Sequence, residues 1–236
     1  MHAQVAHRRA LLIDAMGTLV ALDAPAPRLR RELERRCAVA ISPGDAKRAL
    51  AAEIAYYRAH MQDGRDPASV AALRRRCAET LRAALPAPLR RLDIGVLTEV
   101  LLCVLHFDAF SDARPALEQA RSRGERVIVV SNWDASLPEV LARVGLRDLV
   151  DGVVSSAAAG ARKPGAAIFA RALELAGVGP AQARHVGDSL EEDVAGAAAA
   201  GVPGLWLNRA GLPAPAGVTS IASLAELGAS PGPARA

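Results

Sequence analysis

The chain has 236 residues, of which 51% are hydrophobic and 23% are charged. That length suits one large domain or a core with a smaller companion, and that composition is typical of a globular protein with a substantial core. No apolar run approaches the roughly 18 residues that a membrane span needs, so no membrane partner is expected.

The formal net charge of +4 raises the question of nucleic acid, and the distribution of the charges argues against it. Lysine occurs only at Lys47 and Lys163, while the arginines gather in stretches typical of helices. Aromatic residues make up 3% of the chain, which leaves no platform for stacked bases. We expect a solvated arginine surface with some attraction for acidic substrates, and no nucleic-acid partner.

The N-terminal segment and the cysteines indicate a cytoplasmic protein. Residues 1–9 are basic, but the apolar run behind them is too short for a signal peptide and ends at Asp14. Cys37, Cys77 and Cys103 are widely spaced and form no C-x-x-C pair. We expect all three to be buried free thiols.

The first predicted element is a buried strand over residues 10–13. Its run Ala-Leu-Leu-Ile lacks polar alternation, as in a parallel strand that is covered on both faces. Asp14 ends this run, and Gly17 and Thr18 form a turn behind it. Ligands of open α/β folds bind beyond the carboxyl ends of the strands, so Asp14 stands where chemistry is expected. Taken alone, the same carboxylate is equally compatible with capping the turn.

Residues 28–105 are predicted to be helical throughout. Apolar residues recur at helical spacing from Leu29, and Ser42 and Asp66, each followed by proline, mark further helix starts. A last helix is expected at about residues 92–105. Four helices without a strand predict a small separate bundle.

Strands and helices alternate in the remainder of the chain. Strands are predicted at residues 126–130, 152–154, 184–186 and 204–207, and helices at residues 112–124, 136–145, 166–176 and 191–200. This alternation predicts parallel β-α-β units. We therefore expect an α/β fold with a Rossmann-like parallel sheet and helices on both of its faces.

Three stretches in this part of the chain extend the pattern seen at Asp14. Residues 127–134 read V-I-V-V-S-N-W-D, residues 162–165 read R-K-P-G, and residues 184–193 read R-H-V-G-D-S-L-E-E-D. Together with D-A-M-G-T at residues 14–18, they resemble in order and spacing the four signature motifs of the haloacid dehalogenase-like hydrolases. The resemblance is close in the first and last thirds of the chain and loose in the middle.

The motif residues then have expected roles in phosphoryl transfer. If the strands are parallel, Asp14, Ser131 and Asp188 converge, and Asp14 would attack phosphorus to give an aspartyl-phosphate. Ser131 would bind the non-bridging oxygens, and Lys163 would offset the repulsion between a carboxylate and a phosphate dianion. Further substrate contacts are expected from three residues of the same motifs, Gly17, Thr18 and Asn132.

The acidic residues of the last motif predict bound Mg²⁺. Carboxylates that lie close together repel one another, and a hard divalent cation relieves that repulsion. The family resembled binds Mg²⁺ through the nucleophile, the backbone carbonyl two residues on, and an Asp of the last motif. Here these are Asp14, the carbonyl of Met16, and Asp188, with Asp193 in or near the coordination shell.

The helical insertion falls where this family carries a cap that closes over substrate and excludes water. The resemblance implies an α/β core at residues 1–22 and 108–229, a helical cap at residues 23–107, and a tail at residues 230–236 that is expected to be disordered. Tyr56 and Tyr57, the two tyrosines of the chain, and Arg58 stand out in the cap. One of them is a candidate for facing substrate, although packing of both tyrosines within the cap is the favoured interpretation.

One residue departs from the pattern of the family's phosphatases. In most of them a second Asp, two residues after the nucleophile, protonates the leaving group and later activates water. Met16 occupies that position here, and a thioether does neither job. Haloacid dehalogenases also lack an acid there, because a departing halide needs no proton, but their last motif lacks the acids that Asp188 and Asp193 provide here.

We therefore expect a Mg²⁺-dependent hydrolase of a small phosphorylated metabolite, slow or restricted to activated phosphates such as acyl phosphates. Two alternatives remain open: a 2-haloacid dehalogenase-like hydrolase, and a catalytically weak or silent member that binds a phosphorylated ligand. The sequence does not reveal the substrate, and both a monomer and a homodimer are compatible with it.

Overall fold

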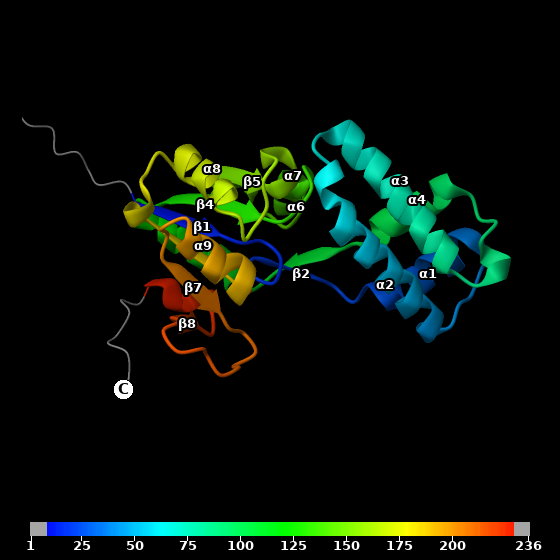
Figure 1. Ribbon diagram of the computed structural model, residues 1–236. Coiled ribbons are helices and arrows are strands. Elements are labelled where there is room, and N and C mark those ends of the chain that lie inside the picture. The colour runs from blue at the N-terminus through cyan, green and yellow to red at the C-terminus, as the bar shows by residue number, and fades with distance from the viewer. Residues whose placement is uncertain (1–8, 229–236) are drawn as a thin grey trace, which may run out of the picture. The chain divides into compact units, whose positions relative to one another are not determined.

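The computed structural model describes residues 9–228, which fall into two compact units (Figure 1). The helical unit comprises Leu22–Asp108 and Trp133–Ser136, and the core unit comprises the other described residues. The tail predicted at residues 230–236 lies outside the described residues. None of the helices in the described chain has both the length and the apolar character needed to cross a membrane.

The core unit is built on a six-stranded parallel sheet (Figure 1). Its strands are β1 (Ala10–Ile13), β4 (Arg126–Ser131), β5 (Gly152–Ser155), β6 (Ala183–Gly187), β7 (Gly204–Leu207) and β8 (Ser220–Ile221). Their order across the sheet is β5-β4-β1-β6-β7-β8. Strand β1 is central: Leu12 lies opposite Ile128 of β4 and His185 of β6.

Five helices accompany the sheet: α5 (Ala113–Ser122), α6 (Leu137–Arg143), α7 (Ser156–Ala159), α8 (Ala166–Ala176) and α9 (Gly196–Ala199). Successive side chains of a strand point to opposite faces, and Leu11, Leu12 and Ile13 are all fully buried, so both faces of the sheet are covered. Leu12 packs in one apolar cluster with Phe169 of α8. The α/β fold expected from the alternating pattern is confirmed.

The helical unit has four main helices and an apolar core of its own. They are α1 (Pro25–Cys37), α2 (Pro43–His60), α3 (Pro67–Ala84) and α4 (Ile94–Val104). The expected caps are present, because Ser42 accepts from the amide of Asp45 and Asp66 accepts from that of Ser69. Leucines of all four helices meet in one cluster: Leu29, Leu33, Leu50, Leu73, Leu81, Leu97 and Leu101.

The side chains singled out in the helical unit are largely structural. Tyr56 and Tyr57 both pack against its apolar core, and Tyr56 also stacks on His60 with ring centroids 4.0 Å apart. Of the cysteines, only Cys77 is buried, while Cys37 is half-buried and Cys103 is exposed. The expectation of three buried thiols is therefore wrong for two of them.

Several short elements were not predicted. Strands β2 (Val20–Leu22) and β3 (Phe107–Ala109) form a separate two-stranded sheet at the two ends of the helical insertion. Single 3-10 turns lie at Met61–Asp63, Ala87–Leu89, Arg147–Leu149, Pro180–Gln182 and Leu224–Gly228. Runs of two to five residues are too short to show a hydrophobic period, which explains why the sequence pattern misses them.

Two helix assignments need correction. The first helix begins at Pro25, three residues before the predicted start at residue 28. Proline is tolerated there because the amide hydrogens of a helix's first turn have no partner within the helix. The helix expected over residues 191–200 is a π-helical segment, Leu190–Ala195, followed by the short α9. Such wide turns are rare and are frequently found at functional sites.

Candidate active site

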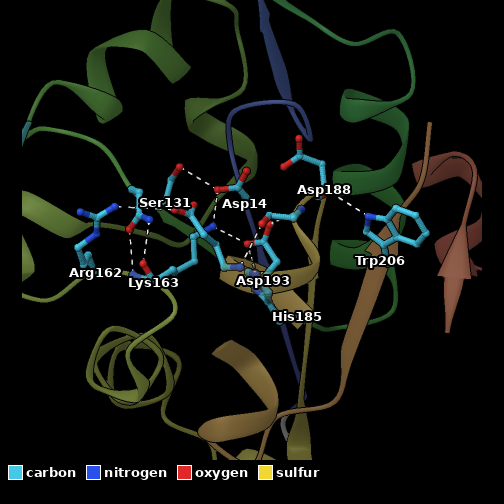
Figure 2. A network of polar contacts seen from close by, with 11 residues as sticks. Asp14, Ser131, Arg162, Lys163, His185, Asp188, Asp193 and Trp206 are labelled. Atoms are coloured by element: carbon cyan, nitrogen blue, oxygen red, sulfur yellow. Dashed lines mark hydrogen bonds and ion pairs between the residues drawn. The ribbon is translucent and has the colours of Figure 1, made fainter. Parts of the chain in front are cut away.

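The predicted motif residues meet at the carboxyl edge of the parallel sheet (Figure 2). Asp14 follows β1, Ser131 ends β4, and Asp188 follows β6. Lys163, from the loop between α7 and α8, completes the group. Parallel neighbours end on the same side of a sheet, so residues that are far apart in sequence come together there.

The carboxylate of Asp14 is buried and bound by two donors. Its Oδ1 accepts a hydrogen bond from Ser131 Oγ at 2.8 Å and lies 2.6 Å from Lys163 Nζ. Burial raises the pKa of Asp14, while the ammonium of Lys163 and the hydroxyl of Ser131 oppose that rise. Asp14 is only 5% exposed, and the nearby ammonium stabilises the ionised form of its carboxylate.

Lys163 is held at both ends. Its Nζ lies between two carboxylates, 2.6 Å from Asp14 Oδ1 and 2.5 Å from Asp193 Oδ1. Burial by itself would lower the pKa of Lys163, but the two carboxylates outweigh it and raise that pKa above its usual value. The amide of Lys163 donates to Asn132 Oδ1 at 2.9 Å, and Asn132 Nδ2 donates to the carbonyl of Lys163 at 3.1 Å. Asn132, expected to contact substrate, thus holds the lysine loop.

Asp193 anchors the lysine from the other side. Its Oδ1 also lies 2.9 Å from His185 Nε2, and its Oδ2 accepts from the amide of Ser189 at 2.9 Å. Although burial favours the neutral acid, the hydrogen bond of His185 and the charge of Lys163 hold the pKa of Asp193 well below its usual value. A Cβ at Gly187 would stand 2.1 Å from Asp193 Cγ, so only glycine leaves room for this carboxylate.

His185 was not predicted as a site residue. It is fully buried on β6, its ring meets Phe169 edge-on at 5.0 Å, and its Nδ1 has no hydrogen-bond partner among residues 9–228. A single histidine within a short strand, eight residues before Asp193, is a weak signal in the sequence. Only the fold shows that the two side chains meet.

Asp188 lies beside the turn that follows Asp14. A Cβ at Gly17, whose φ is +78°, would stand 2.1 Å from Asp188 Oδ2, so this carboxylate occupies the space that a side chain would need. The carbonyl of Asp188 accepts from Trp206 Nε1 at 2.9 Å (Figure 2). Burial, together with the negative charges of Asp14 and Asp193, raises the pKa of Asp188 to about 6.

The charges of this group suit a divalent cation. Oxygen atoms of Asp14, Asp188 and Asp193 all lie within 4.8 Å of one another. Within this group of described residues, three carboxylates face the single ammonium of Lys163, which leaves negative charge uncompensated. Carboxylate oxygens are the donors that Mg²⁺ prefers, so the residues fit this ion. Asp193 already accepts from three protein groups, which leaves Asp14 and Asp188 as the better placed ligands.

The turn between Asp14 and β2 is tightly bonded. The amides of Thr18, Leu19 and Val20 all point to the carbonyl of Ala15, at 3.3, 2.9 and 2.9 Å. Thr18 is fully buried, and its hydroxyl has no hydrogen-bond partner in the described chain. A substrate contact was expected from Thr18, but its side chain is not exposed. The side chain of Met16, in contrast, is partly exposed, with Met16 37% accessible.

Among curated proteins, the relatives are similar to this chain over only part of their own length. Haloacid dehalogenase-like hydrolase domain-containing protein 3 of Bos taurus is 47% identical over 90 residues, which cover 38% of this chain and 36% of that protein. The chain therefore matches little more than a third of that relative. Phosphatase MT3486 of Mycobacterium tuberculosis is 34% identical over 144 residues, which cover 58% of this chain and 66% of that protein.

Solved structures match nearly the whole chain. A HAD phosphatase from Thermococcus onnurineus has a TM-score of 0.63 at 27% identity, covering 93% of this chain and 95% of its own. A 2-haloacid dehalogenase from Pseudomonas syringae pv. Tomato has a TM-score of 0.66 at 24% identity, covering 93% of this chain and 96% of its own, a likeness that shows the fold alone. The model of the haloacid dehalogenase-like hydrolase family matches residues 8–201. With the motif geometry above, this match shows that the chain belongs to the haloacid dehalogenase-like hydrolases.

Proposed function

We propose that this hydrolase is a Mg²⁺-dependent phosphatase of small phosphorylated metabolites that works through an aspartyl-phosphate on Asp14. The observation that carries the proposal is the buried Asp14 carboxylate, bound by Ser131 and Lys163 and flanked by two further carboxylates. Relatives named as phosphatases, from Mycobacterium tuberculosis and Thermococcus onnurineus, support the same reaction class.

Asp14 would act as the nucleophile. A carboxylate oxygen of Asp14 forms a bond to phosphorus while the bond from phosphorus to the leaving oxygen breaks. Ser131 and Lys163 already sit on Asp14, so both can donate to the non-bridging oxygens of a phosphoryl group that arrives there. Water then attacks phosphorus of the aspartyl-phosphate, which releases phosphate and restores Asp14.

The acidic group would hold the cation. Asp14, Asp188 and the backbone carbonyl of Met16 are the proposed ligands. Bound Mg²⁺ would supply positive charge against the phosphate oxygens. Asp193 instead fixes Lys163, since its oxygens accept from His185, Lys163 and Ser189.

Met16 would restrict the leaving group. An alkoxide needs a proton as it departs, and the thioether of Met16 has none to give. Positioned acid-base groups contribute roughly 10²–10⁴-fold to such steps. We therefore propose that the preferred substrates are activated phosphates, such as acyl phosphates, whose leaving group departs as a stable anion.

Phosphate release from a matched set of substrates tests this function. Acetyl phosphate, p-nitrophenyl phosphate and glycerol phosphate are compared with Mg²⁺ and with EDTA, for the natural chain and for Asp14→Asn. We expect Mg²⁺-dependent release that is fastest with acetyl phosphate and absent from the Asp14→Asn variant. No release from any of a broad panel of phosphate esters and acyl phosphates would contradict the proposal.

A 2-haloacid dehalogenase-like activity is the second candidate, because Met16 also suits a halide leaving group. The acidic group argues against it. Asp188 and Asp193 lie beside Asp14, and without a metal ion the repulsion among their negative charges would not be compensated. Chloride release from 2-chloropropionate in the presence of EDTA would decide in its favour.

A further inference from the structure

Arg209, two residues beyond the end of β7, binds the turn that follows Asp14. Its Nη2 donates to the carbonyl of Thr18 at 2.9 Å, and its Nε donates to the carbonyl of Gly17 at 3.4 Å. These two peptide groups come directly after Met16, whose carbonyl is a proposed ligand of the cation. The guanidinium thus holds the backbone of the turn without belonging to the acidic group.

The guanidinium is itself fixed on its other side. Asp112 accepts from both of its terminal nitrogens, each at 2.9 Å, and the ring of Phe110 lies 4.0 Å from its Cζ. Asp112 also accepts from Ser223 Oγ at 2.7 Å and from the amide of Leu224 at 3.0 Å. A two-point pair of this kind sets the orientation of arginine as well as its position.

Burial would raise the pKa of Asp112, but the hydrogen bonds from Arg209, Ser223 and Leu224 outweigh it and hold that pKa below its usual value. The anchor is therefore a charged carboxylate at neutral pH. Arg209 is in this way a rigid brace between the segment before α5 and the turn behind Asp14.

The braced turn is the surface on which Asp188 rests. Oδ2 of Asp188 occupies the place of a Cβ on Gly17, and the carbonyl of the same glycine accepts from Arg209. Trp206, on β7, binds the carbonyl of Asp188 at 2.9 Å. The end of β7 therefore contacts both loops that carry the proposed metal-binding carboxylates.

We propose that Arg209 is a positioning residue that sets the separation of the Asp14 and Asp188 carboxylates and thereby the affinity for a divalent cation. Without its guanidinium, the carbonyls of Gly17 and Thr18 lose their donor and the turn is free to shift. Asp188 then loses the surface that fixes it relative to Asp14. The choice of Mg²⁺ as the cation rests on the proposed function, whereas the brace itself does not.

The test compares Arg209→Lys and Arg209→Gln with the natural chain. Lysine keeps the positive charge but lacks the planar, forked donors of the guanidinium. Arg209→Lys therefore distinguishes the effect of the hydrogen-bond geometry from the effect of the charge. The matched control is Arg143→Lys, an exposed arginine of α6 whose partner is Glu139 at 3.6 Å. Mg²⁺ binding is measured by calorimetry and by the Mg²⁺-dependent shift of the unfolding temperature, and kcat and KM are measured on acetyl phosphate.

We expect both Arg209 variants to bind Mg²⁺ roughly 10–100-fold more weakly, which is the usual effect of removing a group that orients a metal ligand. Arg143→Lys should bind Mg²⁺ with the affinity of the natural chain. Mg²⁺ binding is measured without turnover, so the two proposals can fail separately. If the natural chain binds Mg²⁺ but hydrolyses nothing, the proposed function is contradicted, while weaker Mg²⁺ binding by the Arg209 variants still supports the positioning role.

Unchanged Mg²⁺ affinity in folded Arg209→Lys overturns the positioning role, as does a lowered unfolding temperature with unchanged affinity, which is the mark of a purely structural residue. If Arg209→Gln does not fold, Arg209→Lys decides, together with Asp112→Asn, which loosens the brace but keeps Arg209. A natural chain that binds no Mg²⁺ overturns the role as well.

Discussion

Under the proposed phosphatase function, the side chain at position 16 is expected to decide which phosphate esters are cleaved. In that mechanism, Met16→Asp supplies a carboxylic acid to the departing oxygen. We expect kcat/KM for glycerol phosphate to rise by roughly 10²–10⁴-fold, the usual contribution of a positioned acid, with a much smaller change for acetyl phosphate, whose leaving group needs no proton. Initial rates with both substrates measure the difference.

Met16→Leu is the control for this substitution, because it changes the side chain without adding an acid. It should leave the ratio of the two rates where it was. If Met16→Asp leaves that ratio unchanged too, another group already supplies the proton.

Lys163 is expected to be essential for stability as well as for catalysis. Lys163→Met leaves Asp14 and Asp193 buried without the ammonium that now lies between them. Breaking a buried ion pair by removing one partner costs about 3–5 kcal/mol. Urea unfolding with EDTA at pH 7 should show a loss of that order in the free energy of unfolding, and phosphate release should disappear.

Lys47, the only other lysine, provides the matched control, because it is exposed on α2. Lys47→Met should change the free energy of unfolding by less than about 0.5 kcal/mol, as is usual for surface substitutions. Equal losses in both variants would mean that the buried ammonium is not what stabilises this site.

At the scale of residues, the sequence predicts the acidic and basic groups but not those that hold them. Asp14 and Ser131 each follow or end an apolar run, and Asp188 follows a short strand and a glycine, so each has a local signal in the sequence. His185, Trp206 and Arg209 contact residues that are remote along the chain or belong to another loop. The residues next to them in the sequence give no sign of these contacts. The same holds for Asn132, whose partner is the backbone of Lys163.

The turn between β1 and β2 shows how one element depends on a single glycine. Gly17 has a φ of +78°, and a Cβ there would stand 2.1 Å from Asp188 Oδ2. Gly17→Ala therefore combines backbone strain of roughly 1–2 kcal/mol with displacement of a proposed metal ligand. We expect a loss of stability and a large loss of Mg²⁺ binding, measured by urea unfolding and calorimetry.

Gly124→Ala separates these two effects. Gly124 has nearly the same φ, +75°, but a Cβ there would meet nothing within 4 Å. It should show the backbone strain alone, with normal Mg²⁺ binding. Equal Mg²⁺ affinity in the two alanine variants would show that Asp188 does not depend on the space at Gly17.

At the scale of elements, the long and buried ones are predictable and the short ones are not. Strand β4 contains the apolar run Val127–Val130, which is buried throughout, and α3 has both an N-terminal cap and apolar residues at helical spacing. Strands β2 and β3 have three residues each, and the π-helical segment follows no periodicity distinct from that of an α-helix. Their form is set by what they contact rather than by their own sequence.

At the scale of the whole molecule, each of the two units has its own apolar core, so each has its own determinants of stability. The sequence indicates this division through one contrast, a long helical stretch without strands between two stretches that alternate. It does not indicate that Trp133–Ser136, which follow Ser131 and Asn132 directly, belong to the helical unit. There the amide of Ala135 donates to the carbonyl of Gly64 at 2.8 Å.

The helical unit contains the ionisable group that should dominate its response to pH. Glu53 on α2 is 2% exposed, and its Oε2 has no hydrogen-bond partner in the described chain. Burial raises the pKa of Glu53 to about 7, against a weaker opposing effect of a hydrogen bond with Cys77. In the unfolded chain the same carboxyl has its ordinary pKa of 4.5.

The sign follows from these two values. Because the folded pKa is raised, the folded state keeps a proton that the unfolded state releases between pH 4.5 and about 7. The stabilising contribution of neutral Glu53 is therefore complete below pH 4.5 and lost as the pH rises through about 7. The shift corresponds to a loss on the order of 3 kcal/mol.

Glu53→Gln should remove this dependence, because an amide of the same shape stays neutral at every pH in the range. We expect the free energy of unfolding of the variant, relative to the natural chain, to increase by a few kcal/mol between pH 5 and pH 8. Urea unfolding at both pH values, followed by the far-ultraviolet signal of the helices, measures it. Glu79→Gln on α3 is the control, because Glu79 is exposed and pairs with Arg75 at 3.5 Å, so that its substitution should have the same small effect at both pH values. If Glu53→Gln and Glu79→Gln respond to pH alike, the buried carboxyl of the helical unit is not what makes its stability depend on pH.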